Sequence, residues 1–186
     1  AIRLLPQLPV QRYCLANSSP NVDQKMAKQF SDEQIIERLF SIAGTGGVKT
    51  SDEDTTPFLI DWHAQYHGTA IAVTLPENTA QVSEIMALAD QQNIAVVPQG
   101  GNTGFMGGAT PLPEGRSILL SLRRMNRIRS IDVQNMSMTV EAGCVLQNLH
   151  QETESAGLYF PLNLAAKGSC TIGGNLGTNA GGLNVV

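Results

Sequence analysis

A glycine-rich stretch directly after a short apolar run constrains this chain more than any other feature of its sequence. Five glycines fall in the nine residues from Gly100 to Gly108, and no charged residue occurs between Pro98 and Pro113. The preceding run, Ile94 to Val97, has the composition of a β-strand. Because glycine lacks Cβ and adopts positive φ angles, such a loop can bring successive backbone N–H groups against an anion. This first glycine-rich stretch, residues 98–108, therefore predicts a phosphate or pyrophosphate site, to which Asn102 and Thr103 add side-chain hydrogen bonds.

A second glycine-rich stretch, residues 167–182, has the same character. It contains six glycines and one charge, that of Lys167, and the two stretches together hold eleven of the chain's 18 glycines. Two loops of this kind, far apart in sequence, predict the two lips of one elongated site that is long enough for a dinucleotide. The common nucleotide motifs are absent. No G-x-G-x-x-G follows a strand and opens a helix, and Lys167-Gly168-Ser169 has the wrong order for a P-loop.

Several blocks of sequence, taken together, resemble a known family. In chain order they are Pro98-Gln99-Gly100-Gly101-Asn102-Thr103-Gly104, Leu122-x-x-Met125-Asn126-Arg127, Ala142-Gly143-Cys144, Pro161-Leu162-Asn163-Leu164-Ala165-Ala166-Lys167-Gly168-Ser169, and Ile172-Gly173-Gly174-Asn175 with Thr178-Asn179-Ala180-Gly181-Gly182-Leu183. From about Asp61 onward the chain resembles the FAD-binding half of the FAD-linked D-2-hydroxy acid dehydrogenases, the D-2-hydroxyglutarate dehydrogenase, D-lactate dehydrogenase and glycolate oxidase subunit branch of the vanillyl-alcohol-oxidase-like flavoproteins. Asn163 departs from the acid usual at its position in this branch.

The resemblance implies a cofactor, FAD, and the residues that cradle it. Pro98 and Gly100 to Gly104 would hold the pyrophosphate, and Pro161, Leu162 and the residues from Gly168 to Gly174 would approach the flavin and the ribityl chain. The full set of predicted cofactor-binding residues is Pro98, Gly100, Gly101, Asn102, Thr103, Gly104, Pro161, Leu162, Gly168, Ser169, Cys170, Thr171, Ile172, Gly173, Gly174, Asn175, Asn179, Gly181 and Gly182. Some relatives attach flavin covalently through a histidine at the position of Asn102, so FAD is expected to be held noncovalently here.

The resemblance also implies an activity, which is oxidation of a D-2-hydroxy acid of the 2-hydroxyglutarate, lactate or glycolate type by hydride transfer to flavin. In the relatives the catalytic residues and any metal ligands lie in a C-terminal domain, so no catalytic residue and no metal site is predicted in this chain. The chain is expected to be the N-terminal part of a longer protein and to be inactive alone. Two alternatives are a flavoprotein of the same superfamily with a non-acid substrate, and a non-catalytic fragment that folds without cofactor. The electron acceptor is unknown, and a homodimer is compatible with the sequence.

The predicted fold class is α+β. We expect an FAD-binding domain of the vanillyl-alcohol-oxidase type, with a small βαβ lobe and a lobe whose sheet is mainly antiparallel, incomplete at the C-terminus. The predicted domains are a flexible N-terminal segment over residues 1–28, a helix with a connecting segment over residues 29–65, and a truncated FAD-binding domain over residues 66–186.

Local signals predict the individual elements. Ser31 and Gln34 form a capping-box pattern at the start of a helix that stops at Gly44, and residues 44–56 are expected to form a polar loop. The later elements are a strand at 71–75, a helix capped by Asn78 or Thr79, a strand at 94–97, strands at 117–122, 128–133 and 137–141, and a helix at 145–156 that ends at Gly157. The first three of these predict a βαβ unit with a parallel strand pair, and the strands after residue 115 predict antiparallel pairing.

Composition excludes several classes of partner. The net charge of −4 and the pI near 5.3 argue against nucleic acid, and no apolar run is long enough to span a bilayer. Cys14, Cys144 and Cys170 are predicted to be reduced thiols, with Cys170 buried. His63 and His67 have a metal-ligand spacing, but no other ligands cluster near them, so a structural or surface role is expected.

The first residues leave the location open. Residues 1–24 contain Arg3 and Arg12 and no acid before Asp23, which is compatible with an organelle-targeting segment. A loosely docked terminus is the favoured interpretation. The expected location is therefore the cytoplasm, with the mitochondrion as the alternative.

Overall fold

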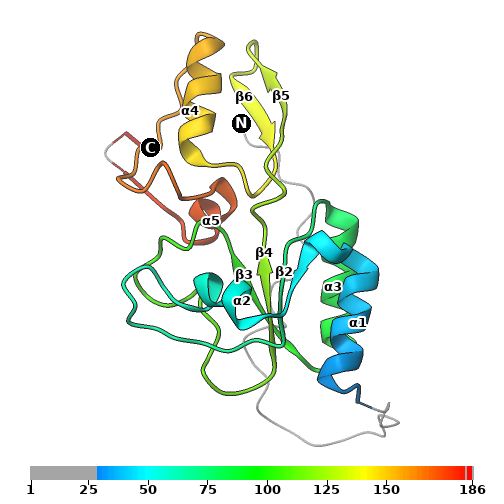
Figure 1. Ribbon diagram of the computed structural model, residues 1–186. Helices are drawn as coiled ribbons and strands as arrows, with labels where there is room; N and C mark the ends of the chain where they lie inside the picture. The colour runs from blue at the N-terminus through cyan, green and yellow to red at the C-terminus, as the bar shows by residue number, and fades with distance from the viewer. Residues whose placement is uncertain (1–28, 183, 186) are drawn as a thin grey trace, which may run out of the picture.

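The fold is built around a four-stranded sheet, seen in a computed structural model that describes residues 29–182, 184 and 185 (Figure 1). Its strands are β1 (Val48–Lys49), β2 (Ala72–Thr74), β4 (Ser117–Ser121) and β3 (Ala95–Gln99), in that spatial order. β2, β4 and β3 run parallel, and β1 pairs antiparallel with β2. The predicted flexible segment over residues 1–28, with Cys14, lies outside the described residues.

Two layers of helices cover this sheet. On one face, α1 (Asp32–Ala43) and α3 (Thr79–Gln91) enclose the main core with the inward residues of β2 and β4. On the other face, α2 (Asp52–Leu59) packs Phe58 against Val73, Leu75 and Leu119. Because neighbouring residues of a strand face opposite sides, a strand with helices on both faces must be apolar throughout. The centre of β4 meets this requirement, since Ile118, Leu119 and Leu120 are apolar and all five residues of the strand are buried.

The local start signals of the helices are confirmed. The Ser31 side chain accepts from the N–H of Gln34 while the Gln34 side chain accepts from the N–H of Ser31, so the capping box at α1 is complete. Gly44 follows α1 with a φ of 73°. Asn78 caps α3 by accepting from the N–H of Gln81 at 3.0 Å.

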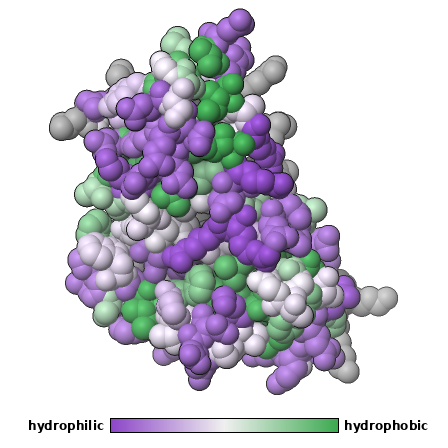
Figure 2. Space-filling view, turned by 45° about the horizontal axis from the view of Figure 1, so that its top comes forward, coloured by the Kyte–Doolittle hydropathy of each residue, from purple (hydrophilic) through white to green (hydrophobic). Residues whose placement is uncertain are grey.

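A second lobe is separate from the sheet. β5 (Ile128–Asp132) and β6 (Ser137–Val140) form an antiparallel hairpin, as predicted, and α4 (Leu146–Ser155) lies beside them. A small core made by Cys144, Leu149 and Ile172 joins α4, the hairpin and the short helix α5 (Ile172–Gly177). Figure 1 shows α5 between the hairpin end of the molecule and the four-stranded sheet. On the face seen in Figure 2, hydrophobic side chains form small groups divided by hydrophilic ones.

Four expectations about the elements are wrong. The supposed polar loop at residues 44–56 contains a 3-10 turn (Thr45–Gly47), β1 and the start of α2. β2 and β3 are parallel but not adjacent, because β4 lies between them. β4 therefore belongs to the parallel sheet and not to an antiparallel lobe. The second glycine-rich stretch is not wholly a loop, since α5 occupies its centre. The predicted division between residues 29–65 and 66–186 stays a proposal. α1 packs into the same core as the later strands, and β1 pairs with β2 in the same sheet.

No helix within the described part of the chain has the length and apolar character to cross a membrane.

Candidate functional site

The first glycine-rich stretch leaves the sheet at the carboxyl end of β3, where open α/β sheets bind ligands. Gln99, the last residue of the strand, is buried, and its Nε2 donates to the backbone oxygens of Phe58 at 2.8 Å and Ala109 at 2.9 Å. The Gln99 side chain thus joins the start of the first glycine-rich stretch to Ala109, just after its end, and to Phe58 in α2. Pro98 fits beside it because β3 is an edge strand, where a missing N–H removes no ladder bond.

The two glycine-rich stretches touch. A Cβ atom built on Gly100 would collide with Thr171 Oγ1, and one on Gly101 would collide with the backbone oxygen of Ser169. Glycine is therefore required at these two positions because the second stretch packs directly against the first. This differs from the expectation that these glycines only make room for a ligand. Gly104 is different, since nothing lies within 4 Å of its Cβ position.

A short turn behind the second stretch holds it in place. The N–H groups of Ile172 and Gly173 donate to the backbone oxygens of Cys144 and Ala142, each at 2.9 Å. Gly143, between these acceptors, lies so close to the backbone oxygens of Leu122 and Met125 that a Cβ atom would collide with them. The sequence blocks around residues 98, 122, 142 and 172 are therefore packed together in space, although they are scattered along the chain.

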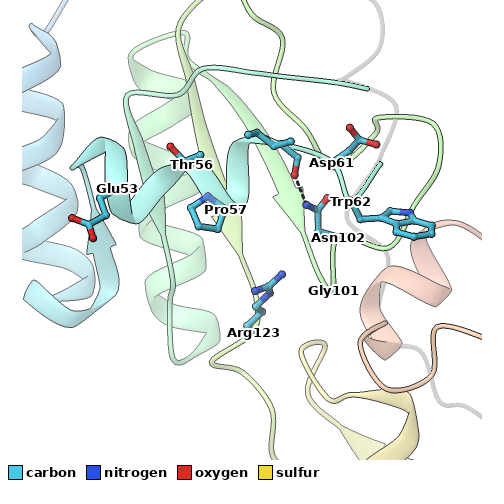
Figure 3. Close-up of a pocket in the computed structure, with 9 residues that line it drawn as sticks. Glu53, Thr56, Pro57, Asp61, Trp62, Gly101, Asn102 and Arg123 are labelled. Carbon is cyan, nitrogen blue, oxygen red and sulfur yellow. Dashed lines mark hydrogen bonds between the residues drawn. The ribbon is translucent and has the colours of Figure 1, made fainter. Parts of the chain in front are cut away.

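Backbone donors of the first stretch are free for a ligand. Among the described residues, no protein group accepts a hydrogen bond from the N–H groups of residues 100–104. Asn102 adopts a left-handed conformation with a φ of 55°, which helps successive N–H groups turn toward one side. Its side chain is already engaged, because Nδ2 donates to the backbone oxygen of Ile60 at 2.8 Å (Figure 3). Asn102 therefore offers its backbone more readily than its side-chain donor.

Three buried polar atoms near this contact have no partner within the described residues: Gln99 Oε1, Ser121 Oγ and Thr171 Oγ1. Gln99 and Ser121 are register partners at the ends of β3 and β4, and Thr171 abuts Gly100. Leaving such an atom unpaired costs about 1–3 kcal/mol, so buried orphans usually mark the place of a water, an ion or a ligand. These three atoms are enclosed by protein, so the donors that fit a phosphate-bearing group beside the contact are the free N–H groups of residues 100–104.

A pocket of about 630 Å³ opens beside the first stretch (Figure 3). It is lined by Glu53, Thr56, Pro57, Ile60, Asp61, Trp62, Gly101, Asn102 and Arg123. Arg123 is held at its rim, because Nε donates to the backbone oxygen of Gly100 at 3.1 Å and the guanidinium carbon lies 5.3 Å from the centre of the Phe58 ring. The pocket therefore combines a fixed cation, two carboxylates and the only tryptophan of the sequence.

Asp61 organises the wall that faces Asn102. It is 3% exposed, and its carboxylate accepts from the N–H groups of Tyr66 at 2.6 Å, Gln65 at 2.7 Å and His63 at 3.2 Å. These backbone donors, that of Tyr66 above all, hold the pKa of Asp61 below its ordinary value, although burial opposes them. Asp61 is thus an ionised centre that shapes the turn from residue 61 to residue 66.

Aromatic side chains from this turn meet the tip of the first stretch. The Phe105 ring centre lies 5.5 Å from that of Trp62 and 5.2 Å from that of His63. Trp62 and Phe105 remain 56% and 63% exposed. The turn is not helical, and His67 bonds the backbone oxygen of Ala64, so the two histidines do not share a helix face. The described residues contain no cluster of potential metal ligands.

The remaining predicted site residues fall into a buried and an exposed group. Leu162 is buried against Leu146 and Cys170, and Cys170 is a buried free thiol, as expected. Asn175 is buried beside the Cys170 sulfur, with Nδ2 at 3.7 Å. Pro161, Gly168, Ser169, Gly174, Asn179, Gly181 and Gly182 are exposed. Gly182 borders Asn163 rather than the first stretch.

Sequence reasoning missed Gln99, Ser121, Asp61, Trp62 and Arg123. Gln99 lay inside a family block without being assigned a role, and Ser121 ends a strand that was assigned to the wrong lobe. An acid next to the only tryptophan, immediately after the apolar run from Phe58 to Ile60, was the available signal for the pocket wall. Nothing in the sequence around Arg123 indicates its contact with Gly100.

Comparison with known proteins decides the family. The FAD binding domain family matches residues 70–186, which include both glycine-rich stretches and the turn behind them. The chain belongs to this family. The match confirms the cofactor implied by the sequence blocks, which is FAD, and the resemblance to FAD-linked oxidoreductases.

Named relatives are longer than this chain. It is 43% identical over 141 residues to a protein of Bos taurus named D-2-hydroxyglutarate dehydrogenase, mitochondrial, a match that covers 76% of the chain and 26% of the relative. It is 37% identical over 179 residues to the protein of the same name from Arabidopsis thaliana, which covers 95% of the chain and 32% of the relative. The chain therefore spans about a third or less of the length of these relatives.

A solved structure shares the fold. Alkyldihydroxyacetonephosphate synthase superposes with a TM-score of 0.73 at 18% identity, over 83% of this chain and 33% of that one. At this identity the likeness concerns the fold alone. It confirms the predicted class, an α+β FAD-binding domain of the vanillyl-alcohol-oxidase type.

Proposed function

We propose that the chain holds FAD noncovalently between its two glycine-rich stretches, as the cofactor-binding part of an oxidoreductase that acts on a D-2-hydroxy acid. The observation that carries the proposal is the contact of Gly100 and Gly101 with residues 169–171, next to free backbone N–H groups and unpaired buried polar atoms. A pyrophosphate needs several such donors, and the chain's net negative charge favours backbone dipoles over lysines for this task.

Each part of the site has a distinct role in this proposal. The backbone N–H groups from Gly100 to Gly104 bind the pyrophosphate. Pro161, Leu162 and the segment from Gly168 to Gly174 approach the flavin and the ribityl chain. Asn175, Asn179, Gly181 and Gly182 complete the second lip. The Asn102 amide is not a nucleophile, so no covalent bond to flavin forms at this position.

When bound, FAD would supply the chemistry of the proposed reaction, as the acceptor of a hydride from the α-carbon of the hydroxy acid. The chain's own residues bind and orient the cofactor and exclude water from its phosphates. Support for the substrate class comes from relatives at 37% and 43% identity that are named D-2-hydroxyglutarate dehydrogenases. The described residues bring no histidine and no paired acid and base to the contact between the two stretches, so we assign no catalytic residue.

We also propose that the protein acts in mitochondria. Both relatives carry that location in their names, and residues 1–24 contain two arginines and no acid before Asp23. These observations favour the mitochondrion over the cytoplasm that the sequence alone led us to expect.

The cofactor proposal is tested with two glycine variants of the purified holoprotein. Gly104 and Gly108 both have open space at the Cβ position and no positive φ, so Gly104→Ala and Gly108→Ala should leave stability unchanged within about 0.5 kcal/mol. Only Gly104 lies in the proposed pyrophosphate loop. Gly104→Ala should weaken FAD binding at least about tenfold, a loss of roughly 1.4 kcal/mol, while Gly108→Ala matches the wild type. Equal affinity in all three proteins, measured by flavin fluorescence, contradicts the proposed loop.

The substrate proposal needs a separate assay. D-2-Hydroxyglutarate, D-lactate and glycolate are offered in turn to the full-length holoprotein with an artificial dye as electron acceptor, and the L-enantiomers of the first two acids serve as the control. We expect dye reduction with at least one of the three acids. Flavin that is bound but reduced by none of the three acids would favour a non-acid substrate.

A further inference from the structure

A histidine outside both glycine-rich stretches is joined to the segment that leads into the second one. His150 lies on α4, half-buried, and its Nε2 is 2.7 Å from the backbone oxygen of Leu162. Because the partner is a carbonyl oxygen, Nε2 carries the proton and donates it.

The segment after α4 depends on that helix for its position. The N–H of Gln147, in the first turn of α4, donates to the backbone oxygen of Lys167 at 2.9 Å. The N–H of Leu146 donates to the backbone oxygen of Cys170 at 3.1 Å. These two bonds hold the C-terminal end of the segment that follows α4. At its near end, among the described residues, the bond from His150 to Leu162 is the only side-chain hydrogen bond that joins α4 to residues 158–167.

Apolar contacts supplement this bond without fixing the backbone. The Phe160 ring centre lies 6.1 Å from that of His150 at an interplanar angle of 50°, and Leu162 packs on Leu146. Such contacts are non-directional, and residues 160–164 form neither helix nor strand. A directed hydrogen bond to a backbone oxygen is what selects one orientation of the peptide group between Leu162 and Asn163.

We propose that His150 is a positioning residue for the cofactor. By donating to Leu162, it holds the Pro161–Leu162 backbone in the conformation in which this segment receives FAD. The inference rests on the proposed function, because that function places Pro161 and Leu162 beside the cofactor. His150 itself borders a separate hollow of about 280 Å³, with Glu154 and Lys167 on its walls, and acts through the Leu162 backbone.

Three variants of the holoprotein test this role. His150→Leu keeps an apolar side chain against Phe160 but removes the donor, and His150→Gln retains an N–H donor of similar reach. Gln151→Leu makes the same kind of change at the exposed neighbouring position. We expect the dissociation constant for FAD to rise about fivefold in His150→Leu, in line with the loss of one hydrogen bond. It should stay within about twofold of the wild type in His150→Gln and Gln151→Leu.

A second measurement separates positioning from general stability. At saturating FAD, the visible absorption maximum and the reduction potential of the bound flavin should change in His150→Leu and return to wild-type values in His150→Gln. A purely structural role would alter thermal stability but leave both flavin properties at saturation unchanged, and that result overturns the proposal. If His150→Leu does not fold, His150→Asn takes its place, because its shorter side chain does not reach Leu162.

The outcomes also distinguish this inference from the function on which it rests. Wild-type protein that holds no FAD overturns the proposed function and the role of His150 together. Wild-type protein that holds FAD, with unchanged affinity and flavin spectrum in His150→Leu, overturns the role of His150 alone.

Discussion

Asn102 in the first glycine-rich stretch is joined to Ile60 by a hydrogen bond of 2.8 Å from Nδ2 to the backbone oxygen. The bond links the carboxyl end of β3 to the end of α2, two elements that are about forty residues apart in sequence. It also fixes Asn102 in its left-handed conformation, which asparagine tolerates better than most residues. The proposed pyrophosphate loop is therefore shaped before any ligand arrives.

Replacing this donor should loosen the loop. Asn102→Asp keeps the shape and the tolerance for positive φ but puts an oxygen opposite the Ile60 oxygen. We expect a loss of about 1–3 kcal/mol in the free energy of unfolding, measured with urea, because an acceptor is left unpaired. Asn126→Asp is the matched control, since Asn126 is exposed and its side chain bonds no other described residue. Similar unfolding curves for both variants would refute the role of the Asn102 bond.

The Asn102 side chain also determines whether flavin can be attached covalently at this position. An amide nitrogen is not nucleophilic, so we expect FAD to be released intact when the holoprotein is denatured in acid and passed through a filter. The filtrate should contain all of the flavin absorbance, and the retained polypeptide none. Flavin that stays with the denatured chain would show a covalent bond, and its mapping would identify another attachment residue.

Local signals in the sequence predicted the helices well and the sheet less well. The Ser31 capping box and the Asn78 cap depend on neighbours three residues away, which is why the sequence alone revealed them. The order of strands depends on distant partners. The apolar run from Ser117 to Leu122 indicates a buried strand but carries no information on whether it lies beside β3 or beside β5.

The central part of the second glycine-rich stretch shows why composition can mislead. Glycine disfavours helix by about 1 kcal/mol per residue relative to alanine, so a stretch that contains Gly173, Gly174 and Gly177 predicts a loop. The structure overrides this preference. The backbone oxygens of Cys144 and Ala142 accept hydrogen bonds from the first N–H groups of α5. Ile172 is also buried in the small core of the second lobe.

The sequence predicted both glycine-rich stretches of the candidate site. It did not predict that Gly100 and Gly101 are required because the second stretch packs directly against them. Gly101 was expected to make room for a cofactor, and the structure adds a backbone oxygen of the protein itself at that place. Arg123 was missed because its bond to Gly100 joins residues that lie about twenty positions apart in sequence. Asp61 was missed although its bonds are local, because nothing in the sequence indicates that its carboxylate accepts from the N–H groups of residues 63–66.

Gly101 and Gly104 should therefore respond differently to alanine. Gly101→Ala forces a methyl group into the backbone oxygen of Ser169, which cannot move without displacing the second stretch. Overpacking of this kind costs about 1–3 kcal/mol, so the urea midpoint should fall clearly even without FAD. Gly104→Ala should leave the midpoint of the FAD-free protein unchanged, because its Cβ position is open. Equal midpoints for the two variants would mean that the stretches do not pack as described.

Asp61 should make the stability of the fold depend on acid pH. Its pKa is lowered in the folded protein, chiefly by the N–H of Tyr66, from an ordinary value of about 3.9. A lowered folded pKa means that the ionised carboxylate stabilises the fold. This contribution is fully present above the unfolded pKa and is lost as the pH falls through the folded pKa. Asp61→Asn should therefore lower the melting temperature at pH 7, because the neutral amide loses the charge-assisted bonds to the turn from residue 61 to residue 66.

The pH dependence of that difference is the decisive measurement. As the pH is lowered through the acid range, the carboxylate of the wild type becomes protonated and its advantage over Asp61→Asn should shrink. Asp90→Asn, an exposed site on α3, should track the wild type throughout. A melting-temperature difference between the wild type and Asp61→Asn that is constant from pH 7 to acid pH would show that the charge of Asp61 does not stabilise the turn. The wall that Asp61 builds beside Asn102 would then owe its position to packing alone.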